Sequence, residues 1–180
     1  MHPRIAEVLD HVEKQRDNLR AVVATIPADR HAVSPAADSW SILHVLEHLS
    51  VVETRIVGVL HKKIGEARAA GLGQETETSP ILPEMRLERL LDRTNKLAAP
   101  EPVRPTGLLD LNAAWAALDK SRAAYRALVA DVDGLALKNV THPHLYFGPF
   151  DGYTWLAFIG SHEARHTAQI REISASLPAT

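Results

Sequence analysis

The sequence predicts an all-α fold, a four-helix bundle with a long connection between its second and third helices. Three observations support this prediction. Nearly every periodic segment repeats its apolar residues at helical spacing, no Asn-Gly type of hairpin signal separates alternating runs, and one long segment rich in proline and glycine interrupts the helical pattern. The chain is long enough for a single domain, residues 1–180, that buries a core without disulfides.

The first two helices are expected at about residues 4–26 and 41–70. The first helix stops at Pro27, which cannot continue a helical hydrogen-bond ladder. Ser41, or a polar residue just before it, caps the second helix, and Gly71 ends it. The second helix carries one apolar stripe: Ile42, Val45, Leu46, Leu49, Ile56, Leu60 and Ile64.

Residues 71–107 differ in character, because polar, proline-rich stretches enclose a short helical piece that begins at Pro83. We expect a crossover here rather than a domain boundary. The third and fourth helices are then expected at about 108–132 and 151–176, and the loop between them contains no convincing strand.

The composition excludes several classes of function. The chain has no cysteine, which rules out disulfides, iron–sulfur clusters, thiolate zinc sites and cysteine nucleophiles. The N-terminus is too charged for a signal peptide and no apolar run approaches the length of a membrane span, so we expect a cytoplasmic protein without a membrane partner. A formal charge of −2 with scattered lysines and arginines also argues against a nucleic-acid partner.

The stretch HEARH, residues 162–166, is the most informative motif of the chain. His162 and His166 fall within about 20° of the centre of the apolar stripe of the fourth helix, so both imidazoles should point into the bundle. A spacing of four residues brings the two rings close enough to share one metal ion. The alternative is a pair of core histidines that only hydrogen-bond to their neighbours, but an apolar seam offers few partners for two such groups.

HEARH also matches H-E-x-x-H, the signature of zinc metalloproteases, and a protease is a remote alternative. That class needs a third protein ligand, and the extended pattern places a histidine shortly after the pair. The continuation TAQIREISASLPAT contains none, and the expected fold has no sheet beside the helix. The third ligand is therefore expected from another helix.

The second helix offers His44 and His48 as the third ligand. His44 lies about 140° from the centre of the apolar stripe and should face solvent, whereas His48 lies about 100° away, at the border of the stripe. Periodicity thus favours His48, and leaves open that His48 is an ordinary surface residue.

Three motifs together resemble the DinB/YfiT-like superfamily: W-S followed by H-L within residues 40–49, an H-P…G turn at 142–148, and H-E-x-R-H-x-x-Q-I at 162–170. The resemblance covers essentially the whole chain and implies a bundle of up-down-down-up topology. It also implies that three histidines hold a divalent metal: His48, His162 and His166. Members of the family include metal-dependent hydrolases, transferases that use low-molecular-weight thiols, and thiol-dependent isomerases, and homodimers are compatible with the family.

Three neutral imidazoles leave a divalent ion its full charge and at least one open position, where water is deprotonated near neutral pH and a thiol is deprotonated outright. We therefore expect a hydrolase or a thiol S-transferase that acts on a small molecule through metal-bound hydroxide or thiolate. Zinc or nickel is the first choice of metal, with iron or manganese as alternatives. The competing class is a non-catalytic metal-binding or scaffold bundle.

Two glutamates are candidates for supporting roles. Glu163 lies at the edge of the stripe and is a candidate base toward bound water, with an exposed or salt-bridged glutamate as the alternative. Glu53 lies near the core centre of the second helix and is a candidate partner that fixes a histidine tautomer, with a buried ion pair to Arg122 or Arg165 as the alternative.

Three further residues are candidates to line the site. Gln169 shares the inward face of the fourth helix with the two histidines, and its alternative role is to satisfy a helix carbonyl. His142 and His144 lie on the loop before that helix and are candidates for substrate contact. The simpler interpretation, which we take as the default, is that both belong to an ordinary surface turn.

Overall fold

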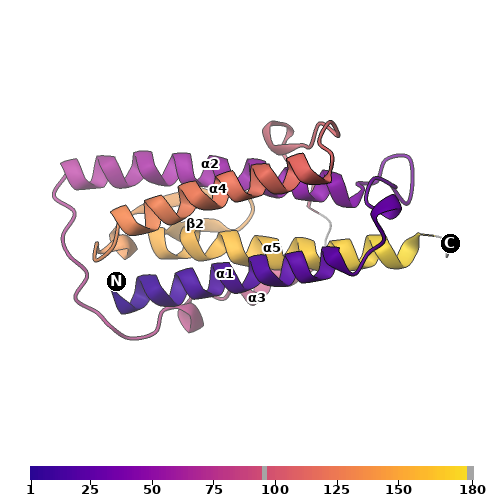
Figure 1. Cartoon of the computed structure of the whole chain (residues 1–180). Coiled ribbons are helices and arrows are strands. Elements are labelled where there is room, and N and C mark those ends of the chain that lie inside the picture. The colour runs from indigo at the N-terminus through magenta and orange to yellow at the C-terminus, as the bar shows by residue number, and fades with distance from the viewer. Residues whose placement is uncertain (95–96, 178–180) are drawn as a thin grey trace.

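The computed structural model describes residues 1–94 and 97–177, and it confirms the all-α four-helix bundle. Four long helices form the bundle: α1 (Pro3–Ala24), α2 (Ile42–Ala69), α4 (Leu111–Asp131) and α5 (Gly152–Ser176). In Figure 1, α1 and α5 run in one direction while α2 and α4 run in the other. The topology is therefore up-down-down-up, as predicted.

Polar residues cap the N-termini of the long helices, and Ser41 is the cap that the sequence predicted. The side chain of Ser41 accepts a hydrogen bond from the backbone N–H of His44, and the His44 side chain accepts one from the backbone N–H of Ser41, which forms a reciprocal cap. Asp110 caps α4 and Asp151 caps α5: in each case the aspartate side chain accepts a hydrogen bond from a backbone N–H of the first helical turn, without the reciprocal bond seen at Ser41. The observed bounds lie within three residues of the expected ones.

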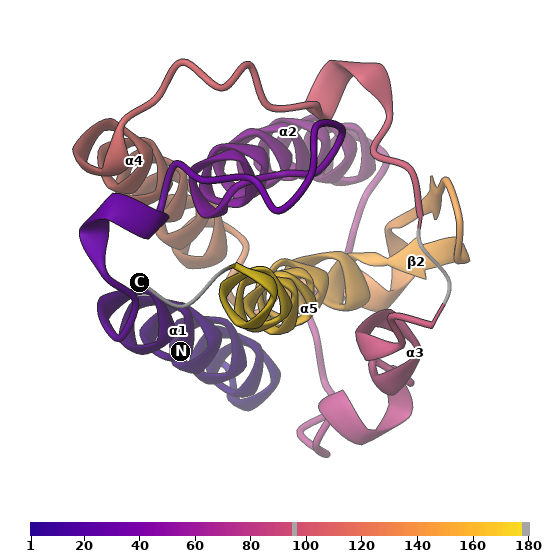
Figure 2. The ribbon, with the colours of Figure 1, turned by 90° about the vertical axis from the view of Figure 1, so that its right-hand side faces the viewer.

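The helices pack as two parallel pairs, α1 with α5 and α2 with α4, and α5 also contacts α2 (Figure 2). The apolar stripe predicted for α2 is buried throughout. Helices α1 and α5 approach closely at Gly160, where an added Cβ would lie 2.9 Å from Cα of Val12. Because α5 also packs against α2, the two helices that carry the candidate histidine ligands are in contact.

The crossover between α2 and α4 runs back along the bundle, because these two helices are parallel (Figure 1). The helical piece expected from Pro83 is reduced to a 3-10 turn (Leu82–Glu84) and a single α-helical turn, α3 (Glu88–Leu91). A hydrogen bond from Thr94 N to the Asp92 carboxylate, 2.9 Å, replaces the helical pattern there. Residues 95–96, the next part of the expected piece, lie outside the described residues. A second 3-10 turn (Glu101–Val103) follows.

The expectation that no strand precedes the last helix is wrong. Strands β1 (Thr141–His144) and β2 (Gly148–Asp151) form an antiparallel hairpin with His144 opposite Gly148. Gly148 has φ +82°, and the N–H of Tyr146 donates to Nδ1 of His144, so local contacts close the three-residue turn. Strands of four residues that each contain a proline give too little alternation to be recognised in the sequence.

Among the described residues, none of the helices has the combination of length and apolar character that a membrane crossing requires.

Candidate metal centre

Three histidines from two helices meet in the middle of the bundle. His48 on α2 and His166 on α5 are buried, at 4% and 8% exposure, and His162 on α5 is half-buried. One ring nitrogen from each lies within 4.8 Å of the other two. The structure thus brings together the three residues that the sequence and the family resemblance predicted as ligands.

Hydrogen bonds fix two of these rings with one nitrogen directed at the cluster. Nδ1 of His48 donates to the carbonyl oxygen of Val103, 2.7 Å away, and Nδ1 of His166 donates to Oε1 of Gln169, also at 2.7 Å. A neutral imidazole carries only one N–H, so Nε2 of each ring keeps its lone pair. Partners of this kind orient the histidine ligands of metal sites.

The spacing of the free nitrogens fits a metal ion. Nε2 of His162 lies 3.1 Å from Nε2 of His166. Nitrogens at about 2.0–2.1 Å from a tetrahedral zinc ion lie roughly 3.3 Å apart, close to this value. A proton on His162 Nε2 can satisfy only one neighbouring lone pair, whereas the lone pairs of His48 and His166 are both available. The donor set therefore fits a cation better than a hydrogen-bonded histidine cluster.

All three histidines are held in the neutral form that binds metals. Burial lowers the pKa of His48, and it lowers the pKa of His162 well below the usual value. Burial together with the nearby His48 lowers the pKa of His166 to about 3. The imidazoles therefore offer lone pairs at neutral pH and below it, with no proton to displace.

The residue before His48 anchors the loop to which His48 bonds. Glu47 is 5% exposed, and its carboxylate accepts hydrogen bonds from the N–H of Thr106 (2.8 Å), the hydroxyl of Thr106 (2.6 Å) and the N–H of Gly107 (2.9 Å). Burial opposes ionisation of Glu47, but these hydrogen bonds bring the pKa of the carboxyl below its usual value. Glu47 and His48 therefore fasten the same loop, with Val103, to α2.

The predicted role of Glu53 is wrong, because in the described part of the chain its carboxylate forms no hydrogen bond with a histidine. Among the described residues its carboxylate bonds to Arg16 (2.9 Å), Arg122 (2.7 Å) and Ser121 (2.7 Å). The alternative interpretation, a buried ion pair with Arg122, is the observed one. The tautomer-fixing partners are instead Val103 and Gln169.

The carboxylate of Glu163 faces the same arginines rather than the histidine nitrogens. Its Oε1 accepts from Nε of Arg16 at 2.7 Å, and its Oε2 lies 3.0 Å from a terminal nitrogen of Arg122. Burial raises the pKa of Glu163, while Arg16 and Arg122 act in the opposite direction. These contacts match the salt-bridged alternative for Glu163, and with Glu53 they form a buried network of two cations and two anions. We assign Glu163 no role as a base.

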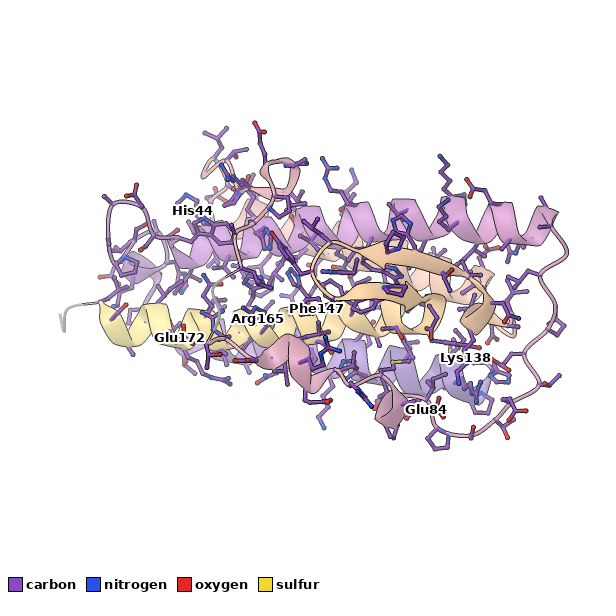
Figure 3. All side chains as sticks on the ribbon, turned by 180° about the vertical axis from the view of Figure 1, so that it is seen from behind. His44, Glu84, Lys138, Phe147, Arg165 and Glu172 are labelled. Carbon is purple, nitrogen blue, oxygen red and sulfur yellow. The ribbon has the colours of Figure 1, made fainter. Side chains whose placement is uncertain are left out.

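A cavity of about 750 Å³ opens beside the histidines and is lined by all three of them. Gln169 and His144 also line it, as the sequence suggested. His142 does not: its backbone carbonyl accepts from the indole N–H of Trp155, which fastens the hairpin to α5. Figure 3 shows the hairpin residue Phe147 and the α5 residues Arg165 and Glu172 along the cavity side of the molecule.

Residues 11–170 match the sequence model of the DinB superfamily. The chain belongs to the DinB superfamily. It is 30% identical to the uncharacterized protein YuaE of Bacillus subtilis strain 168 over 144 residues, 79% of this chain and 82% of YuaE. The crystal structure of TT2238, a four-helix bundle protein, resembles it with a TM-score of 0.59 at 24% identity, covering 93% of this chain and 98% of that one. That likeness supports the fold of this DinB-superfamily chain.

Several residues of the site in this DinB-superfamily protein were not predicted from the sequence. Val103 contributes a backbone carbonyl, so no side-chain pattern could have revealed it. Glu47 lies beside a predicted ligand, but its loop partners are known only from the fold. Trp40 belongs to the W-S motif, but its place at the site was not predicted: its ring centroid lies 4.9 Å from that of His48, and it lines the cavity.

Proposed function

We propose that this DinB-superfamily protein is a metal-dependent enzyme, a hydrolase or a low-molecular-weight-thiol S-transferase, in which His48, His162 and His166 hold a divalent ion. Zinc and nickel are the metals proposed first, since both suit imidazole ligands. One observation carries the proposal: the three histidines line a 750 Å³ cavity instead of being sealed in the core. Catalytic sites leave a position open to substrate, whereas closed structural sites do not. The cavity therefore favours the enzyme over a non-catalytic scaffold.

A divalent ion held by three neutral imidazoles would supply Lewis acidity and lower the pKa of a ligand in its open position. The side chains of this protein prepare that chemistry. Val103 and Gln169 keep Nδ1 of His48 and His166 protonated, so that Nε2 faces the centre. Nδ1 of His144 accepts from the N–H of Tyr146, which leaves the Nε2–H of His144 as a hydrogen-bond donor for a substrate in the cavity.

Carboxylates contribute little to proton transfer in this proposal. Glu53 and Glu163 are occupied by arginines, and of the two carboxylates on the cavity lining, Glu172 is paired with Arg93. The proton released by the substrate or co-substrate therefore passes to solvent water. In S-transfer the thiol gives its S–H proton to water, its sulfur forms a bond to an electrophilic carbon, and the bond from that carbon to the leaving group breaks, so that the leaving group departs with the bonding pair. Because the chain has no cysteine, that thiol is a separate molecule.

The third histidine comes from α2, and family membership accounts for the H-E-x-x-H pattern without a protease. The metalloprotease alternative is therefore set aside in favour of the bundle site.

The test is metal content by mass spectrometry on protein purified without an affinity tag, for the wild type and for His48→Ala, His162→Ala and the control His61→Ala. His61 is exposed on α2, outside the cavity. We expect about one divalent ion per chain in the wild type and the control, and loss of the ion in the other two variants. A wild type that takes up no zinc or nickel would contradict the proposal.

Activity screens distinguish hydrolysis from thiol S-transfer. Metal-loaded protein is screened for hydrolysis of small esters and amides, and for conjugation of low-molecular-weight thiols to electrophiles. We expect turnover in one of the two screens that disappears on chelation and in His162→Ala. Metal binding with no turnover in either screen would favour the scaffold.

A further inference from the structure

The cavity beside the histidines has an unusually aromatic wall for this chain. Its rings run from the metal centre outward: that of Trp40 lies 4.9 Å from His48, and that of Phe158 lies 5.2 Å from His162. Leu145, which is 71% exposed at the tip of the hairpin, extends the apolar surface to the rim. Five of the nine aromatic residues of the chain line this one cavity: Trp40, Tyr146, Phe147, Trp155 and Phe158.

The cavity lining carries a net positive charge, although the chain as a whole is negative. The chain has a formal charge of −2, yet the lining contains two carboxylates, from Asp38 and Glu172, against four guanidinium groups. Glu172 forms a two-point ion pair with Arg93, at 2.8 and 2.6 Å. The surrounding histidines are neutral and do not offset the excess of positive charge. The arginines come from four segments of the chain: Arg55, Arg93, Arg104 and Arg165.

Two of these arginines are free to bind a ligand. Arg55 is exposed on α2, seven residues after His48, so it lies on the same face of the helix about 10 Å farther along. Arg104 is exposed beside Val103, and its Nε donates to the carbonyl oxygen of Ala99. In the described part of the chain, neither Arg55 nor Arg104 forms an ion pair with a carboxylate.

We infer that the cavity binds an amphipathic organic anion, a carboxylate attached to an aromatic or aliphatic body, with the carboxylate at Arg55 and Arg104 and the body along the aromatic wall. This inference rests on the proposed function and names its class of substrate. Guanidinium groups match carboxylates with two parallel hydrogen bonds, and a cavity of this size encloses a small organic molecule. Arg55 lies about 10 Å along α2 from His48, so a ligand whose carboxylate pairs with Arg55 is long enough to extend toward the histidines.

The same features argue against other ligands. A cationic ligand would meet four guanidinium groups, and like-charge contact is unfavourable.

The test compares three probes that share a body and differ in charge: 6-phenylhexanoate, 6-phenylhexan-1-ol and 6-phenylhexylamine. Binding is measured by titration calorimetry on metal-free protein, so that the result does not depend on any reaction. We expect the acid to bind at least about tenfold more tightly than the alcohol or the amine. We expect Arg55→Gln and Arg104→Gln each to reduce that preference roughly threefold to tenfold without changing alcohol binding. Both residues are exposed, so both variants should fold.

Arg89→Gln is the matched control, because Arg89 is exposed on α3 outside the cavity lining. Equal binding of the acid and the alcohol, or the same loss in Arg89→Gln as in the two cavity variants, would overturn the inference. So would acid binding that requires the metal, because the ion would then recognise the anion instead of the arginines. A protein that prefers the acid but takes up no metal would retain this inference while the proposed function fails.

Discussion

Nδ1 of His48 lies 2.7 Å from the carbonyl oxygen of Val103, a residue 55 positions later in the chain. This hydrogen bond joins a candidate metal ligand to the crossover between α2 and α4. It fixes the tautomer of His48, and the crossover is in turn fixed by the neighbouring Glu47. The crossover is therefore part of the candidate metal centre and not only a connection between helices.

Replacing Glu47 should weaken metal binding even though Glu47 is not a ligand. In Glu47→Ala the carboxylate that holds Thr106 and Gly107 is lost, so the carbonyl of Val103 is no longer held against His48. Loss of a partner of this kind costs about 10- to 100-fold in metal affinity, and we expect about tenfold here because Glu47 acts through the loop. Zinc affinity is measured by competition with a chromophoric chelator. Glu66→Ala, an exposed change on the same helix, should leave the affinity unchanged, and equal affinities for the wild type and Glu47→Ala would contradict the role of the loop.

The buried ion network should be a major determinant of stability. Glu53 is 3% exposed and accepts from both Arg16 and Arg122, so Glu53→Ala leaves excess positive charge in the core. Breaking a buried pair in this way costs about 3–5 kcal/mol of unfolding free energy. Urea denaturation followed by circular dichroism measures the change. The control Glu84→Ala removes the solvent-exposed pair with Lys138 and should change the unfolding free energy little; a similarly small loss in Glu53→Ala would count against the network.

Acid should destabilise the metal-free protein partly through His144. Burial lowers the pKa of His144 from 6.5 to about 4 in the folded protein. Between these values the unfolded chain binds a proton that the folded protein does not, so the unfolding free energy falls as the pH falls from 6.5 toward 4. His144→Phe, a change to an apolar ring among Phe147 and Phe158, should show a shallower decrease over that range. Denaturant titrations of both proteins at several pH values check this, and parallel pH dependences would refute it.

The close approach of α1 and α5 depends on Gly160. In Gly160→Ala the new methyl group would lie 2.9 Å from Cα of Val12, a backbone atom that cannot rotate away. Overpacking of this kind costs about 1–3 kcal/mol, which thermal and urea unfolding would detect. Gly58→Ala is the matched helical control, with nothing within 4 Å of the new methyl group, and should instead stabilise α2 by roughly 0.5–1 kcal/mol. A Gly160→Ala protein as stable as the wild type would mean that the two helices can separate without cost.

Local signals in the sequence accounted for the helices and for the candidate metal ligands on α5. The apolar stripe of α2 repeats at helical spacing, and Ser41 and Asp151 provide side-chain caps, so helix bounds follow from neighbours within a few residues. His162 and His166 were recognisable because a spacing of four residues is enough to bring two rings together. His48 required the family resemblance, because periodicity left it at the border of its stripe.

The tertiary structure was needed to show which groups hold the histidines in place and which groups balance buried charge. Glu53 and Glu163 are inward-facing on their helices, and periodicity cannot show whether an inward carboxylate meets a histidine or an arginine on another helix. The Val103 carbonyl and the arginines of the cavity likewise come from segments far apart in the chain. Short-range periodicity and spacing in the sequence were enough to predict the helices, the class of fold and the chemistry of the candidate ligands. The contacts between elements were determined by packing, because they depend on the register and rotation of helices that no local pattern specifies.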